Sequence, residues 1–184
     1  MKHIASMTLM LTLGVAAVYA QEKPVKMTFS GNGAASPINL NQPNTNTAEE
    51  NVAGNGTLRR FTFRNVTAIA TSPSPQPPST CSGPTQLFFP SVVGAGIFRF
   101  QDGSLLRVNL TQGGDCIDLA AQQGHCTLAL QITGGTGRFK GAFGVLTYTE
   151  TALPVLADAS YNPVFFTETG EITGTISGVG YSNP

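Results

Sequence analysis

Apolar and polar residues alternate along most of this chain, and a period of two predicts strands whose two faces meet different surroundings. The candidate strands are residues 24–30, 56–71, 96–101, 104–110, 126–133, 144–151, 164–169 and 171–177. A turn is expected near Gly170, between the last two. Short strands at this spacing, with almost no helical periodicity, predict an all-β fold, a single antiparallel β-barrel of about eight strands. A β-sandwich is the alternative.

Turn-forming residues separate these strands. Asp102 and Gly103 lie between two alternating runs and predict a tight hairpin. Residues 31–55 are rich in Asn, Gly and Pro and predict a long connection; within it, residues 47–50 have the spacing of a capping box, which predicts one helical turn. Residues 72–90 carry several prolines, which exclude a central strand and predict a loop.

The N-terminal residues predict an export signal. Lys2 and His3 precede an uncharged, mostly apolar stretch at residues 4–18, and small residues follow up to Ala20. This pattern is typical of a secretory signal peptide, residues 1–20, cleaved after Ala20. A membrane anchor is the alternative, but about fifteen apolar residues are fewer than the roughly 20 that span a bilayer. We therefore expect a secreted or periplasmic chain, residues 21–184, that forms one domain without a membrane span.

Charge excludes several partners. Charged residues make up 11% of the chain, against about 25% in a typical soluble domain. Ten Lys and Arg balance ten Asp and Glu, so there is no basic excess to neutralise phosphates and we expect no nucleic-acid binding. Thr, Asn, Ser and Gly supply the polarity that charged residues usually supply.

Three cysteines permit at most one intramolecular disulfide. Cys126 opens an alternating run and is expected on a buried strand face, whereas Cys81 and Cys116 lie in polar, loop-like segments. We therefore prefer a Cys81–Cys116 bridge, with Cys116–Cys126 as the alternative. His125 is the sole histidine after the export signal and no CxxC pair exists, so we expect neither a metal nor another cofactor.

The most specific stretch is residues 132–144, ITGGTGRFKGAFG. It lacks the Gly-Lys-Ser/Thr ending of a P-loop and the last glycine of a dinucleotide-binding motif. Glycines instead allow sharp bends at a barrel corner, and a phenylalanine between them can enter the core as a plug. The corner residues are Gly134, Gly135, Gly137, Phe139, Gly141 and Gly144.

This corner resembles the Gly-Gly-Thr-Gly-x-Phe segment of dirigent proteins and the Gly-Gly-Ser-Gly-x-Phe-x-Gly segment of allene oxide cyclases. The resemblance is clear over residues 94–151. It implies an eight-stranded antiparallel barrel, often a homotrimer, with an apolar pocket in the barrel mouth. Dirigent proteins guide the coupling of phenoxy radicals, and allene oxide cyclases cyclise a fatty-acid epoxide. Their catalytic residues have no matched positions here, so the resemblance implies a fold and a cavity but no activity.

Candidate chemistry rests on few residues. His125 lies beside no nucleophile motif, so a hydrolytic triad is not expected. A glycosidase needs two spaced carboxylates, and Glu150 and Glu168 lie near strand ends where they could approach each other. The other acidic candidates are Asp102, Asp115, Asp118, Asp158 and Glu171, and Asp102 is explained by the hairpin turn.

The candidate cavity residues are Tyr148, Glu150, Arg99 and Arg107. Alternation leaves two arrangements of the arginines open. If Phe98 and its alternating neighbours point inward, both arginines face outward; with the faces exchanged, they line a cavity beside Tyr148 and Glu150. We favour the outward arrangement.

Three functions follow from this reading. The first is a secreted barrel without catalysis, structural or binding a small ligand. The second is an enzyme of the cyclase, isomerase or dirigent type that guides a reactive apolar molecule in the barrel. The third is a β-sandwich adhesion or matrix module. A small apolar molecule is the expected partner, and whether the chain is an enzyme is left open.

Overall fold

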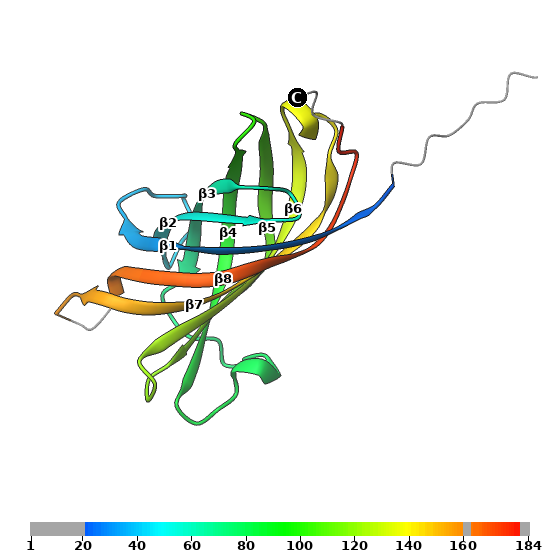
Figure 1. The fold of residues 1–184 in the computed structure, drawn as a ribbon. Coiled ribbons are helices and arrows are strands. Elements are labelled where there is room, and N and C mark those ends of the chain that lie inside the picture. Colours follow the sequence, from blue (N-terminus) through cyan, green and yellow to red (C-terminus); the bar gives the residue numbers. More distant parts are fainter. Residues whose placement is uncertain (1–20, 160–162, 181–184) are drawn as a thin grey trace, which may run out of the picture.

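The chain folds into one closed barrel of eight antiparallel strands that neighbour one another in chain order (Figure 1). The computed structural model describes residues 21–159 and 163–180. The strands are β1 (Lys23–Ser36), β2 (Thr45–Gly56), β3 (Phe61–Ala70), β4 (Gln86–Phe100), β5 (Leu105–Asp118), β6 (Gln123–Gly135), β7 (Phe143–Ala157) and β8 (Pro163–Ser177). Two short 3-10 turns are η1 (Ser79–Cys81) and η2 (Gly137–Phe139). The predicted all-β barrel is confirmed, and closure of the sheet excludes the sandwich.

The predicted signal peptide, residues 1–20, lies outside the described residues. None of the helical segments in the described part of the chain has the length and apolar character needed to cross a bilayer.

The long connection predicted at residues 31–55 is wrong, because most of it is strand. β1 runs on to Ser36, and β2 occupies the segment in which a helical turn was expected. Ala48, Glu50 and Val52 alternate toward the barrel interior, and β2 pairs along its length with both β1 and β3. Two ladders of backbone hydrogen bonds outweigh the weak local preference of a capping-box sequence for a helix.

The turn predicted near Gly170 is also wrong, since β8 is continuous from Pro163 to Ser177. Gly170 pairs with Phe29 on one side and Glu150 on the other. A Cβ atom at this glycine would lie 2.1 Å from the carbonyl oxygen of Thr149, so close approach of the neighbouring strand requires glycine here. The sequence analysis missed β2 and divided β8 into two strands. These two errors cancel, so the predicted number of strands is correct although two of the assignments behind it are wrong.

The proline-rich loop is shorter than predicted, because β4 begins at Gln86 and includes Pro90. Pro90 pairs with Gly114 of β5, while the pairing between β3 and β4 ends at Ser91. The segment before Ser91 is therefore an edge, where a residue without an N–H is tolerated. The hairpin predicted at Asp102 and Gly103 does connect β4 to β5.

Apolar side chains fill the half of the barrel that carries the β2–β3, β4–β5 and β6–β7 connections, here called the plugged end. Aromatic rings dominate it: Phe63 stacks on Phe98 with ring centroids 4.1 Å apart, and Phe139 packs against Phe100 at 4.7 Å. Phe139 is completely buried, so the glycine corner does insert an aromatic plug.

Arg138 holds the Phe139 plug in place. Its guanidinium lies 4.3 Å from the ring centroid of Phe139, forms an ion pair with Asp102 at 2.9 Å and donates a hydrogen bond to the carbonyl oxygen of Leu58 at 2.7 Å. The bend itself depends on Gly137, whose φ of 57° lies in the left-handed region and whose missing Cβ leaves room for Ser104. The sequence motif is thus accounted for by the architecture of the corner.

The disulfide joins Cys81 to Cys116, as preferred, and connects the loop before β4 to β5. Cys126 is free and buried, so the alternative Cys116–Cys126 bridge is wrong. The register shift in β5 between Leu110 and Gln112 explains why Cys116 does not meet Cys126. Beyond this irregularity the alternation of β5 changes face, so Cys116 and Cys126 lie on opposite faces of the sheet.

Candidate functional site

Polar side chains gather inside the barrel next to its apolar half. They come from five strands, and the cluster begins where the ring of Tyr148 stacks on Phe29, with centroids 4.6 Å apart. Beyond that stack, toward the end opposite the plug, the interior changes from aromatic to acidic. The residues, here called the acidic cluster, are Glu50 and Asn65 of β2 and β3, Asp115 of β5, Tyr148 and Glu150 of β7, and Glu168 of β8.

Tyr148 connects two of the acids. Its hydroxyl lies 2.7 Å from Oε2 of Glu150, to which it donates, and 3.4 Å from Oε2 of Glu168. On the other side, Nδ2 of Asn65 donates to Oε2 of Glu50 at 2.7 Å. Both arrangements are local consequences of strand geometry, because Glu50 and Asn65 face each other across β2 and β3, and Tyr148 and Glu150 are two residues apart on one face of β7.

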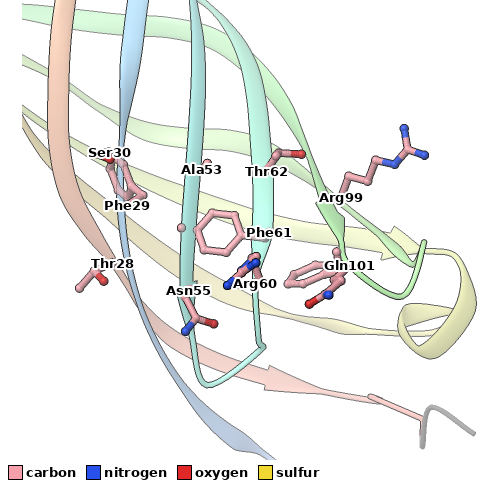
Figure 2. Close-up of a pocket in the computed structure, with 12 residues that line it drawn as sticks. Thr28, Phe29, Ser30, Ala53, Asn55, Arg60, Phe61, Thr62, Arg99 and Gln101 are labelled. Carbon is pink, nitrogen blue, oxygen red and sulfur yellow. The ribbon is translucent and has the colours of Figure 1, made fainter. Parts of the chain in front are cut away.

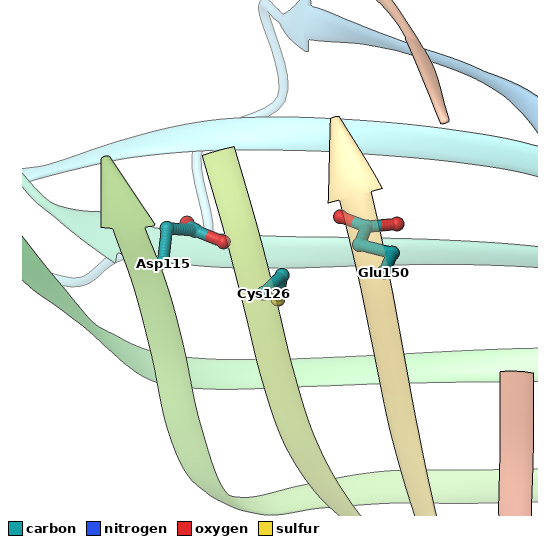
Figure 3. A group of neighbouring side chains, drawn as sticks. All are labelled: Asp115, Cys126 and Glu150. Atoms are coloured by element: carbon teal, nitrogen blue, oxygen red, sulfur yellow. The ribbon is translucent and has the colours of Figure 1, made fainter. Parts of the chain in front are cut away.

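Asp115 reaches this interior through the irregularity in β5. After the register shift, Asp115 pairs with Cys126, which in turn pairs with Glu150. Figure 3 shows these three side chains on adjacent strands, and one ligand-type atom of each lies within 4.8 Å of the others. A second group, Glu50, Glu150 and Glu168, also has one carboxylate oxygen of each residue within 4.8 Å of the others. Glu150 belongs to both groups and is the centre of the cluster.

The cluster contains no basic side chain. Among residues 21–159 and 163–180, every lysine and arginine other than Arg138 is exposed, and Arg138 lies at the plugged end. Four carboxyl groups therefore share the interior without a protein cation to balance them. Their charge must be removed by protons or offset by something bound.

Burial and mutual repulsion raise the pKa of these acids. Burial raises the pKa of Glu168 to about 7 and that of Asp115 to about 6. Burial, followed by a hydrogen bond with Glu168 and by its charge, puts the pKa of Glu150 well above its ordinary value. Burial, followed by the charge of Glu150, does the same for the pKa of Glu50. Such a pair of interacting carboxyls holds a proton near neutral pH, where ordinary glutamates are ionised.

Two oxygen atoms in the cluster accept no hydrogen bond. They are Oε1 of Glu168 and Oδ1 of Asn65, on residues that are 2% and 6% exposed. Buried acceptors without partners are uncommon because each loses its hydration without compensation. A proton held between Glu150 and Glu168 supplies one donor within that pair. Oδ1 of Asn65 has no such source, so it indicates that a donor or a cation belongs beside it.

The structure brings together only some of the predicted cavity residues. Tyr148, Glu150 and Glu168 meet inside the barrel. Arg99 and Arg107 are exposed on the outer surface, so the arrangement in which they line a cavity beside Tyr148 is wrong. The physical reason is alternation: Phe98 and Leu106, next to them in sequence, are completely buried.

Sequence reasoning missed Glu50 and Asn65. Glu50 fell in the segment that was taken for a connection, although its alternation with Ala48 and Val52 was a usable signal. Asn65 gave no signal beyond its place in an alternating strand. Asp115 was considered, but nothing in the sequence marked the irregularity in β5 that turns it inward.

Other candidate residues have structural roles. Asp118 accepts hydrogen bonds from the backbone N–H groups of Ala120 and Ala121 and so closes the turn after β5. His125 is exposed, and its ring atoms lie within hydrogen-bond distance of Thr151 and Gln123. Neither residue contacts the acidic cluster through a described hydrogen bond.

Two hollows lie on the outer wall of the barrel. The larger, about 840 Å³, runs over β1 to β4, and Arg60, Arg99 and Gln101 border it (Figure 2). The smaller, about 430 Å³, is bordered by His125 and by threonines of β6, β7 and β8. Tyr148 borders neither, but Glu150 and Cys126 also border the smaller hollow, which therefore lies against the acidic cluster.

No family model and no curated protein matches this chain. Among solved structures, a pterocarpan synthase that is a dirigent protein is similar at 12% sequence identity, with a TM-score of 0.41, over 89% of this chain and 90% of that chain. The resemblance to allene oxide cyclases stays a prediction.

Proposed function

We propose that this chain is an exported, non-catalytic barrel that binds a small molecule carrying a hydroxyl group on an aromatic ring. The observation that carries the proposal is the pair of buried, unpartnered acceptors, Oε1 of Glu168 and Oδ1 of Asn65. A hydroxyl donor satisfies such an acceptor, and the adjacent rings of Phe29 and Tyr148 favour an aromatic partner. The purely apolar ligand expected from the sequence would leave these oxygens unsatisfied.

The test compares two probes that differ in one donor. Thermal unfolding of the purified, chelator-treated protein is measured with increasing 4-methylphenol and, separately, with 4-methylanisole, whose oxygen cannot donate. The phenol should raise Tm with concentration and the ether should not, because binding to the folded state stabilises it. Glu168→Gln should reduce the shift, whereas the exposed Glu171→Gln, on the same strand, should retain it. Equal shifts with both probes would contradict the proposal.

A proton-transfer enzyme of the isomerase or cyclase type is the second candidate. It is favoured by one observation: Glu150 and Glu168 contact the same tyrosine hydroxyl, and burial raises the pKa of Glu168 to about 7, suitable for an acid–base group near neutral pH. Incubation with cyclohexanone in D₂O would test it. If the unmodified chain exchanges the α-hydrogens faster than the Glu150→Gln variant does, the result supports catalysis. Equal exchange rates for the two proteins contradict it.

Export and a trimeric assembly complete the proposal. The Cys81–Cys116 disulfide supports an oxidising compartment. N-terminal sequencing of protein recovered outside the cytoplasm should begin at Gln21, and the native mass should be that of three chains. An uncleaved N-terminus would contradict the export signal, and a strictly monomeric mass would contradict the trimer.

A further inference from the structure

We infer that Glu50, Glu150 and Glu168 form an interior site for one hard divalent cation of the calcium type, with the amide oxygen of Asn65 as a further ligand. The three carboxylates come from β2, β7 and β8, so only closure of the barrel brings them together. One carboxylate oxygen of each lies within 4.8 Å of the others. Ligands bonded to one calcium ion at about 2.4 Å lie at most about 4.8 Å apart, so atoms within this limit can all reach one ion.

Asn65 supplies evidence that is independent of the acids. It is 6% exposed, and its Nδ2 donates to Glu50 at 2.7 Å, so its amide group lies against the carboxylate group. Its other atom, Oδ1, has no hydrogen-bond partner. Carboxylates and amide carbonyls are the usual protein ligands of calcium, and an unpartnered amide oxygen on a residue hydrogen-bonded to Glu50 extends such a set.

Charge supports the same conclusion. The glutamates of this site have no lysine or arginine among them, since all described basic residues other than Arg138 are exposed and Arg138 is bound at the plugged end. A divalent cation offsets most of the charge of three carboxylates.

The neighbouring group of Asp115, Cys126 and Glu150 is the competing site, because it shares Glu150 and offers a sulfur ligand that suits zinc. Two observations favour the oxygen site. The unpartnered oxygens belong to Glu168 and Asn65, which lie outside the competing group. Zinc would also require the Cys126 thiolate, which is buried among acids that oppose a further negative charge.

The test is calorimetric titration of the purified, chelator-stripped chain with CaCl₂, MgCl₂ and ZnCl₂, with native mass spectrometry to count bound ions. One calcium ion per chain is expected, bound more tightly than zinc. Glu168→Gln and Glu50→Gln should each weaken binding roughly tenfold or more, a loss of the kind seen when a metal site loses one supporting group. Glu171→Gln, exposed on the same strand as Glu168, is the matched control and should bind as the unmodified chain does.

Several results would overturn the inference: no calcium bound, calcium binding unchanged in Glu168→Gln, or zinc bound preferentially and lost in Cys126→Ser. Thermal unfolding of each variant checks that it folds, and replacing a buried charge by a neutral amide of the same shape preserves packing. The inference rests on acceptors that the proposed function also uses. Because phenol binding is measured on chelator-stripped protein, failure to bind calcium and failure to bind 4-methylphenol are separate outcomes.

Discussion

The hydroxyl of Tyr148 donates to Oε2 of Glu150 across 2.7 Å inside the barrel, at the boundary between its aromatic and acidic halves. The ring of this tyrosine belongs to the apolar core, and its oxygen lies among the acids. One side chain therefore joins the part of the barrel that supplies stability to the part that offers chemistry.

Stability should decrease as pH rises through neutrality. Burial raises the pKa of Glu168 to about 7 from an ordinary 4.5, so the folded state holds a proton that the unfolded state has released. The free energy of unfolding is therefore greatest below the unfolded pKa and falls as pH approaches and passes about 7, by about 3 kcal/mol for this group. Urea unfolding at a series of pH values measures it.

Glu168→Gln should flatten that pH dependence, because the neutral amide does not titrate. Glu171→Gln is the control and should follow the unmodified chain, since Glu171 is exposed. Burial also raises the pKa of Asp115, to about 6. This group adds a similar decrease in the free energy of unfolding at lower pH, and both variants should retain it. Identical pH profiles for all three proteins would show that Glu168 is not held protonated.

Tyr148→Phe should lower the free energy of unfolding by about 1–3 kcal/mol. The ring and its stacking on Phe29 are kept, but Glu150 loses a buried hydrogen-bond donor. Thermal unfolding and circular dichroism would measure the loss and show that the barrel persists. A variant as stable as the unmodified protein would mean that the hydroxyl contributes nothing to the folded state.

Removing the disulfide should destabilise the barrel without abolishing it. Cys81 and Cys116 are separated by 35 residues. Without the bridge the unfolded chain gains conformational entropy, which lowers the free energy of unfolding by about 3–4 kcal/mol for a loop of that length. The measurement is urea unfolding of a variant with both cysteines replaced by serine. Replacing Cys81 alone would leave an unpaired thiol, so the double replacement is the cleaner comparison.

Cys126 should resist alkylation in the folded protein. Its side chain is buried, and burial raises the pKa of the thiol well above its ordinary value, as does the negative charge of Asp115. Reactivity requires an accessible thiolate. Mass spectrometry should find no iodoacetamide adduct under native conditions and one adduct per chain after denaturation without reduction. Rapid labelling of the native chain would contradict the buried position.

Alternation along the chain was sufficient to predict an all-β fold, the β4–β5 hairpin and the inward faces of several strands, because the period of two records directly which side chains leave water. The choice of a barrel over a sandwich was decided by closure of the sheet. The glycine corner and its aromatic plug were likewise predicted from the sequence, since glycine is favoured where φ is positive. The outward direction of Arg99 followed from its neighbour Phe98 by the same rule.

Tertiary structure decided the rest. β2 forms although its local sequence favours a connection, because it pairs with β1 and β3, and β8 runs through Gly170 because a neighbouring strand passes close to it. The acidic cluster depends on closure of the barrel, which brings Glu50 and Glu168 together from opposite parts of the chain. A linear pattern specifies the face on which each residue lies. Which residues meet across that face depends on register, irregularities and closure, which are properties of the assembled sheet.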